Sequence, residues 1–252
     1  MKKPDAFGLT NLGGRENNED RFGIYDESSP LFKLDRGYLY CVADGMGGHK
    51  AGETASKIAA ERMQEYYSEL HTISNDSSIT DLLHELFIQA NAELISQGKS
   101  NEQYQAMGTT LTVAVVKDRN LYYTHIGDSR LYLCRENHLE QLTDDQTIAA
   151  ELYRMGKISE EELAKHPLRN QLLSYLGMSD QLTVQTGQRE LAEDDRFLLC
   201  TDGLIDVVKD QRLAQLLSVD SNAEDICGSL INSAIENDTT DNITSIVGLL
   251  ST

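Results

Sequence analysis

The chain has 252 residues, which suffices for one large domain or two small ones, each with a substantial hydrophobic core. Its 41 acidic residues against 22 Lys and Arg give a formal net charge of -19, which disfavours binding to nucleic acid or an anionic membrane and favours cations. No run approaches the ~18 apolar residues of a membrane span, and no apolar export segment follows Met1. We therefore expect a cytoplasmic protein, in which four cysteines without a Cys-x-x-Cys pair are reduced core residues.

The first part of the chain predicts strands followed by helices. Short runs of β-branched and aromatic residues predict strands at 6–11, 20–25 and 38–43, with a loop rich in glycine and charge at 12–20. Apolar residues three and four positions apart predict one amphipathic helix from Thr54 and a second around 83–94. A polar loop at 71–78 joins them.

The second part predicts further blocks of strands and helices. Strands are predicted at 108–116, 121–126 and 131–134, and the short turns between them favour an antiparallel meander. Residues 143–182 carry mixed helical signals and form an excursion. Strands at 183–186, 196–200 and 243–250 enclose two helices around Leu213 and Leu230. Such blocks indicate an α+β fold with antiparallel sheets.

Asp44 lies where the strand at 38–43 is predicted to end, and glycines at 45, 47 and 48 follow it. A dinucleotide fingerprint would need glycine at Lys50, and a P-loop would need Gly-Lys-Ser/Thr, so a phosphate-binding loop is disfavoured. A simple Asp-Gly turn stays open. So does a site for a hard divalent cation, in which the Gly45 carbonyl is a second oxygen ligand.

Other acids occupy the same kind of position, at strand ends or in tight turns. They are Glu19-Asp20, Asp128, Asp202 and Asp241. Carboxylates gathered at one sheet edge would repel one another unless cations bind between them. Because no histidine or cysteine consistently accompanies them, the ligands are all oxygen, which suits Mg²⁺ or Mn²⁺ better than Zn²⁺.

The order of these motifs resembles that of the metal-dependent protein Ser/Thr phosphatases of the PPM or PP2C type, especially the bacterial members. The matching segments are Gly13-Gly-Arg15-Glu-Asn-Asn-Glu-Asp20, Asp44-Gly-Met-Gly-Gly-His49, Gly108-Thr-Thr110, Gly127-Asp-Ser-Arg130, Leu142-Thr143, Thr201-Asp-Gly-Leu204 and Asp241-Asn-Ile-Thr244. Each motif is weakly specific, but seven in order span nearly the whole chain.

The resemblance implies a single domain at 1–252, folded as a four-layer α-β-β-α sandwich of two antiparallel sheets flanked by helices, with a flap-like excursion at about 147–181. It implies a core site for two Mn²⁺ or Mg²⁺ ions. Asp44 would bridge both ions, the Gly45 carbonyl would bind one, Asp202 and Asp241 would complete the other, and Asp20 would act through water. Asp128 would hold a third, weaker ion, and Arg15 would bind the substrate phosphate.

The implied reaction is hydrolysis of phosphoserine and phosphothreonine by a water or hydroxide that bridges the two ions. Phosphoproteins modified by a Ser/Thr kinase would be the substrates, and we expect a monomer. A catalytically weak binding or regulatory module of the same fold is the alternative. Two departures from the family pattern bear on the site: Gln146 stands where members often carry histidine, and Asn237 to Thr240 lack a common glycine. His49 is only a weak candidate for a general acid.

Overall fold

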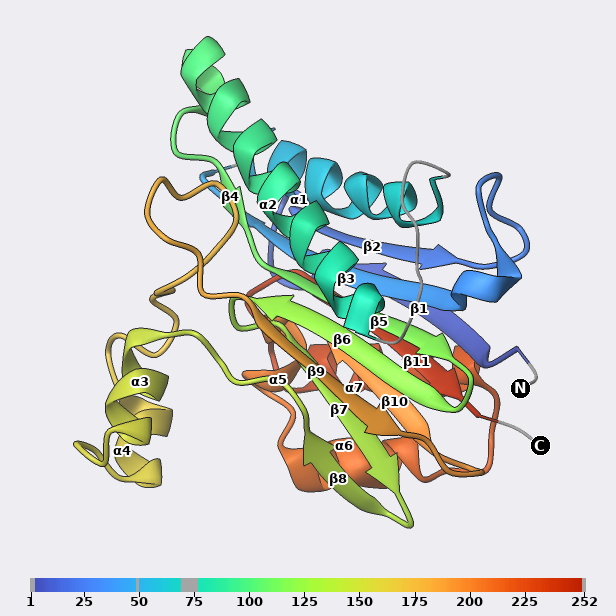
Figure 1. The fold of residues 1–252 in the computed structure, drawn as a ribbon. Helices are drawn as coiled ribbons and strands as arrows, with labels where there is room; N and C mark the ends of the chain where they lie inside the picture. The colour runs from blue at the N-terminus through green and yellow to red at the C-terminus, as the bar shows by residue number, and fades with distance from the viewer. Residues whose placement is uncertain (1–2, 49, 69–76, 251–252) are drawn as a thin grey trace.

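The computed structural model describes residues 3–48, 50–68 and 77–250 and consists of two antiparallel sheets that lie face to face (Figure 1). The strand order of sheet I is β1 (Asp5–Asn11), β11 (Ile243–Leu249), β10 (Arg196–Cys200), β7 (Arg130–Arg135) and β8 (His138–Gln141). The order of sheet II is β2 (Asp20–Tyr25), β3 (Tyr38–Met46), β5 (Leu111–Lys117), β6 (Asn120–Ile126) and β9 (Gln185–Glu190), with β4 (Gly108–Thr109) paired to β3.

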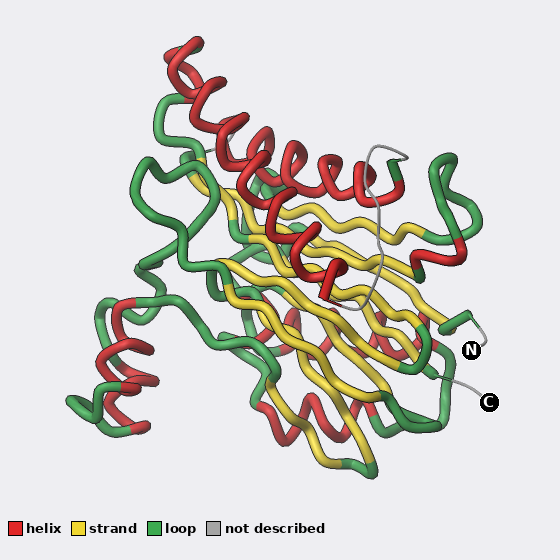
Figure 2. The backbone as a smooth tube through the Cα atoms, in the orientation of Figure 1, coloured by secondary structure: helices red, strands yellow, loops and turns green. Residues whose placement is uncertain are grey.

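Helices cover the outer face of each sheet (Figure 2). Sheet II is covered by α1 (Lys50–Arg62), which continues as a 3-10 turn at Met63–Tyr67, and by α2 (Ser77–Ser100). Sheet I is covered by α5 (Asp202–Ile205), α6 (Asp210–Leu217) and α7 (Ala223–Glu236). The predicted α-β-β-α sandwich is therefore confirmed. Two short helices, α3 (Ile148–Arg154) and α4 (Glu160–Lys165), stand to one side of the layers (Figure 1).

The alternation of side chains along β3 explains the layering, because successive residues of a strand point to opposite faces. Tyr40 and Val42 face sheet I, where the Tyr40 and Phe197 ring centroids lie 5.0 Å apart. Leu39 and Cys41 pack instead in the core beneath α1 and α2. Each fully buried large apolar side chain contributes about 1.5–3 kcal/mol to folding. Both faces of β3 are thus buried, which is why its sequence reads as one apolar run.

Two predicted boundaries near the central glycines are wrong. The strand expected at 38–43 continues to Met46, because Asp44 pairs with Asp20 and Gly45 pairs with Thr109. The helix expected from Thr54 begins at Lys50. Its early glycine, Gly52, carries little helix propensity, but it packs directly against Gly45. Tertiary contact therefore outweighs local propensity at this point.

The predicted meander at 108–134 is also corrected. Its first strand breaks at Thr110 into β4 and β5, and only β5 and β6 form a hairpin. The turn at 127–129 carries the chain across to sheet I, where β7 pairs with β10 and with β8, a strand that the sequence analysis missed. The strand expected at 183–186 lies at Gln185–Glu190.

Two further expectations concern loops and cysteines. The predicted loop at 71–78 falls mostly outside the described residues, and α2 has begun by Ser77. All four cysteines are free and buried, as expected of reduced core residues. Within the described ranges, no helix combines the length and apolar character needed to cross a membrane.

Candidate active site

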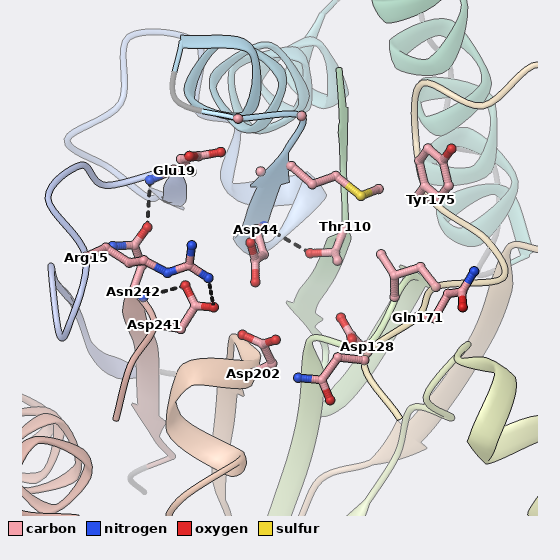
Figure 3. A pocket seen from close by; sticks show the side chains of 16 residues that line it. Arg15, Glu19, Asp44, Thr110, Asp128, Gln171, Tyr175, Asp202, Asp241 and Asn242 are labelled. Carbon is pink, nitrogen blue, oxygen red and sulfur yellow. Dashed lines mark hydrogen bonds and ion pairs between the residues drawn. The ribbon is translucent and has the colours of Figure 1, made fainter. Parts of the chain in front are cut away.

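A cleft of about 560 Å³ opens at the edge of the sandwich where strand ends of both sheets meet (Figure 3). All the residues predicted for the site except Asp20 line this cleft. They are Arg15, Asp44, Gly45, Asp128, Asp202 and Asp241. The four aspartate side chains point into a common space (Figure 3). Asp44 comes from β3 in sheet II, whereas Asp202 opens α5 and Asp241 precedes β11 in sheet I. Both sheets therefore contribute acids to one site.

Hydrogen bonds from neighbouring residues fix the backbone of Asp44. Its N–H donates to the Thr110 hydroxyl at 2.9 Å, and its carbonyl accepts the Thr110 N–H at 2.9 Å and the Thr109 hydroxyl at 2.8 Å. The break between β4 and β5 thus supplies the groups that fix Asp44, while no hydrogen-bond donor in the described residues reaches its carboxylate. Burial, followed by the charges of the neighbouring aspartates, raises the pKa of Asp44 well above its usual range.

Gly45 permits a close approach that no other residue would allow. A Cβ atom at this position would lie 2.1 Å from the Gly52 carbonyl oxygen and 2.7 Å from that of Glu19. The Gly45 N–H also donates to the Glu19 carbonyl at 3.1 Å. The first turn of α1 and the end of the Arg15 loop, residues 12–19, therefore pack against the backbone beside Asp44.

Asp20 is the exception among the predicted residues, because it lies behind the cleft rather than on its wall. Its buried Oδ2 accepts hydrogen bonds from the hydroxyls of Thr201 at 2.8 Å and Thr244 at 2.7 Å. Burial nevertheless outweighs these bonds and raises the pKa of Asp20 to about 7. Since Asp20 belongs to β2 and Thr244 to β11, this buried group links the two sheets directly beneath the site.

Gln146 fixes the turn that carries Asp128. The Gly127 N–H donates to Gln146 Oε1 at 3.0 Å, and the Gln146 N–H donates to the Gly127 carbonyl at 2.8 Å. The Gln146 carbonyl in turn accepts the Leu173 N–H at 2.7 Å, which attaches the returning part of the excursion. Glutamine therefore has a defined structural role at the position where family members often carry histidine.

Buried groups surround the same turn. The fully buried His125 meets the Thr112 hydroxyl through Nδ1 at 2.8 Å and the Gly127 carbonyl through Nε2 at 3.1 Å. Burial lowers the pKa of His125 to about 4, so the ring is neutral at neutral pH. Burial, with nearby Asp145 and Asp206, raises the pKa of Asp128 to about 7.

Arg15 lies at the rim of the cleft, where its Nη2 donates to Asp241 Oδ2 at 2.5 Å (Figure 3). The loop that carries Arg15 is held by Asn242, a residue to which the sequence analysis gave no role. Asn242 Oδ1 accepts the Glu19 N–H at 2.8 Å, and its Nδ2 donates to the carbonyls of Leu12 at 3.0 Å and Asn17 at 2.9 Å. Its position directly after Asp241 was the only signal in the sequence.

The donor set fits hydrated divalent cations. Asp202 Oδ1 is buried without a hydrogen-bond partner, and burial raises the pKa of Asp202 well above its usual range. Among the residues that the structure describes, no three His, Cys, Asp or Glu side chains come close enough together to enclose one ion. Mg²⁺ commonly binds through one or two carboxylates and keeps several waters, so it suits such a site. His49 lies outside the described residues.

Residues 8–230 match the family model described as protein phosphatase 2C. The chain belongs to the protein phosphatase 2C family. It is 31% identical over 233 residues to the serine/threonine phosphatase stp of Listeria monocytogenes, which covers 92% of this chain and 90% of that protein. It is 35% identical over 236 residues to the serine/threonine protein phosphatase PstP of Mycobacterium tuberculosis, which covers 92% of this chain and 42% of PstP.

Solved structures support the same assignment. The serine/threonine phosphatase of S. agalactiae superposes with a TM-score of 0.91 at 28% identity, covering 99% of this chain and 100% of that one. Stp1 from Staphylococcus aureus superposes with a TM-score of 0.89 at 30% identity, covering 100% and 96% of the two chains. The resemblance drawn from the sequence motifs is thereby confirmed.

The excursion of this protein phosphatase 2C chain has two parts. Its outer part carries α3 and α4, away from the sandwich (Figure 1). Its returning part lines the cleft through Asn170, Gln171, Leu172 and Tyr175. The Thr109 and Leu176 backbones exchange hydrogen bonds of 3.0 and 2.9 Å, which fixes this returning part beside Asp44. The sequence analysis placed the excursion but did not separate its two parts.

Proposed function

We propose that this protein phosphatase 2C family member hydrolyses phosphoserine and phosphothreonine in proteins, with water as the nucleophile and Mn²⁺ or Mg²⁺ as cofactor. The observation that carries the proposal is the cleft in which aspartates from both sheets face one another beside Arg15. A phosphate monoester brings negative charge into this acidic cleft, so its binding requires both cations and the guanidinium.

The core site would hold two ions. Asp44 would be their common ligand, with the Gly45 carbonyl on one ion and Asp202 and Asp241 on the other. Because no three acidic side chains of the described residues group around one point, part of this coordination would pass through water. Asp20 would act from behind through water, and Asp128 would hold a third, weaker ion. When bound, such ions would lower the pKa of a water in the cleft, so that a nucleophile exists near neutral pH, and would offset the charge of the phosphate.

The residues of the chain supply binding and position. Arg15 would turn from Asp241 toward the substrate phosphate, where its planar guanidinium can donate two parallel hydrogen bonds. Asn242 holds the loop that carries Arg15, and Thr110 holds Asp44, so both groups act from fixed backbones. Such prior positioning lowers the entropic cost of reaching the reactive geometry.

The remaining expectations are also part of the proposal. We infer a single domain that acts as a monomer in the cytoplasm on substrates of a Ser/Thr kinase. The excursion at 147–181 would contact the protein part of these substrates, because its returning part lines the cleft. The high negative charge supports the absence of nucleic acid and membrane partners.

Phosphate release from a phosphothreonine peptide tests this function. We expect turnover with Mn²⁺ or Mg²⁺ and none with EDTA, and an equal rate in EDTA would refute the cation requirement. A catalytically weak binding module would bind the phosphopeptide but release almost no phosphate at any cation concentration. Such a module is the alternative function. Binding without phosphate release would distinguish it both from turnover that needs a cation and from turnover that persists in EDTA.

A further inference from the structure

A second hollow of about 460 Å³ adjoins the cleft. One wall comes from the last turns of α2 and residues 102–107, and the other comes from residues 175–180. Tyr175 lines both the hollow and the cleft. We propose that this hollow is a specificity subsite that accepts a lysine or arginine side chain of the substrate, near the phosphorylated residue. The inference rests on the proposed phosphatase function and names a preferred class of phosphopeptide.

The wall between the two spaces is fixed. The backbone of Leu176 is hydrogen-bonded to the backbone of Thr109. The N–H of the following residue, Gly177, donates to Asn91 Oδ1 of α2 at 2.6 Å. The Tyr175 ring packs on Gly108, where a Cβ atom would lie 2.7 Å from its Cδ2. Tyr175 is thus fixed by its ring contact and by the two residues that follow it, and the second hollow exists before any substrate binds.

The geometry of an extended peptide sets which residue enters the hollow. Two residues of extended chain advance about 7 Å, and side chains two positions apart point to the same side. Arg15 and Tyr175 lie at opposite sides of the cleft (Figure 3). A peptide that presents its phosphate near Arg15 and leaves past Tyr175 would therefore direct side chains two or four positions from the phosphorylated residue toward the hollow.

The charges of the hollow favour a cation. Its charged lining residues are two acids, Glu102 and Asp180, and one lysine, Lys99. Within the described residues, none of these three side chains forms an ion pair. The carbonyl end of α2, a helix of 24 residues, also points its negative dipole end toward this region. Ile95 and Met178 offer apolar surface for the methylene stem of a lysine or arginine.

The test compares phosphothreonine peptides that carry arginine, alanine or glutamate two or four positions from the phosphothreonine, on either side. For the wild type we expect kcat/KM to be about twofold to fivefold higher with arginine than with glutamate, the range for exposed charge pairs. The subsite variant Glu102→Lys with Asp180→Lys should remove or reverse this preference. Its kcat/KM for a small aryl phosphate should stay unchanged, because neither residue lines the cleft.

The matched control is Glu193→Lys with Asp220→Lys, which changes the net charge equally. Both residues lie at the far end of β10, where Arg196 Nη1 donates to the Val219 carbonyl at 2.5 Å. The control should keep most of the preference for arginine. The inference is overturned if both double variants shift the preference equally, or if the wild type has none. Absence of phosphate release from every peptide and from the aryl phosphate would instead refute the proposed function itself.

Discussion

Arg15 makes an ion pair with a residue that is also a proposed cation ligand. Its Nη2 lies 2.5 Å from Asp241 Oδ2, so the guanidinium and a cation compete for the same carboxylate. Arg15→Ala should raise KM for phosphopeptides and lower kcat/KM by about 10- to 100-fold, because the substrate phosphate loses charge-assisted hydrogen bonds that contribute about this factor. Its Mn²⁺ affinity should be equal to that of the wild type or higher.

Steady-state kinetics and calorimetric titration with Mn²⁺ check this prediction. Arg189→Ala serves as the control, because Arg189 pairs with Glu140 on sheet strands away from the cleft. Loss of Mn²⁺ binding in Arg15→Ala would show that the arginine supports the cation site rather than the phosphate.

Gln146 gives a second prediction at the level of single residues. Gln146→Met preserves side-chain volume but leaves the Gly127 N–H without its acceptor, which costs about 1–3 kcal/mol of unfolding free energy. The turn that carries Asp128 should loosen, so the weakest Mn²⁺ site should bind less tightly. Hydrogen exchange at the Gly127 amide and Mn²⁺ titration measure the two effects.

Gln146→Glu keeps an acceptor oxygen at the same place and serves as the matched comparison. Exchange at Gly127 should stay slow in this variant and become faster in Gln146→Met. Equal exchange in the two variants would remove Gln146 from the role of holding the turn.

The sequence predicted four aspartates of the cleft, but it assigned no role to Glu19, which also lines the cleft, and it identified few of the groups that hold these acids. Asp44, Asp128, Asp202 and Asp241 could be found because carboxylates at strand ends follow a local pattern. The hydrogen bonds of Asn242 and Thr110 depend on which distant segments meet, and a single sequence carries no local signal for that. Asp20 shows the same limit, since only the fold reveals that it lies behind the cleft.

At the level of elements, the sequence predicted most of the strands but not which of the two sheets each strand joins. Short turns usually join neighbouring strands, yet the turn at 127–129 crosses from β6 in sheet II to β7 in sheet I. Gly127 allows this path with a φ of 109°, and a Cβ atom there would lie 2.5 Å from Thr110 Cγ2. Apolar periodicity reports which faces are buried, not which sheet buries them, so the predicted meander was wrong at this strand.

We expect removal of the outer part of the excursion to leave the cleft intact. The Ile148 N–H donates to the Gln171 carbonyl at 2.9 Å, so the two ends of the segment already lie side by side. Replacing residues 149–169 by Gly-Gly leaves a three-residue connection that includes Asn170, a common hairpin length. Hydrolysis of a small aryl phosphate should change less than about threefold, whereas kcat/KM for a phosphoprotein should fall further.

Parallel kinetics on the two substrates decide the role of α3 and α4. An equal loss on both would mean that the outer part supports the cleft itself. A melting curve of the shortened protein, with and without Mn²⁺, shows whether the sandwich and its cation site are intact.

At the level of the whole molecule, the candidate site links the two sheets, because Asp44 belongs to sheet II while Asp202 and Asp241 adjoin strands of sheet I. In EDTA, Asp44→Asn should melt at the same or a higher temperature than the wild type, since it removes one of several repelling carboxylates. With Mn²⁺ at 100 times its Kd, the wild type should gain about 2.7 kcal/mol of stability, and the variant should lose most of that gain.

Thermal melts of both proteins, with EDTA and with Mn²⁺, measure this reversal of rank. Asp220→Asn, a change at an exposed carboxylate away from the cleft, should gain as much from Mn²⁺ as the wild type. If Mn²⁺ raised the melting temperature of Asp44→Asn by the full wild-type amount, Asp44 would not be a cation ligand.

The position of β11 between β1 and β10 affects how the protein is made on the ribosome. Of the strands in the two sheets, β1 is synthesised first, but β11, which lies beside it, is synthesised last. Until that strand arrives, the Arg15 loop lacks Asn242 and the buried Asp20 lacks Thr244. A chain interrupted before Asp241 should therefore release no phosphate in a translation reaction supplied with Mn²⁺, so a growing chain cannot act on cellular phosphoproteins before β11 has been synthesised.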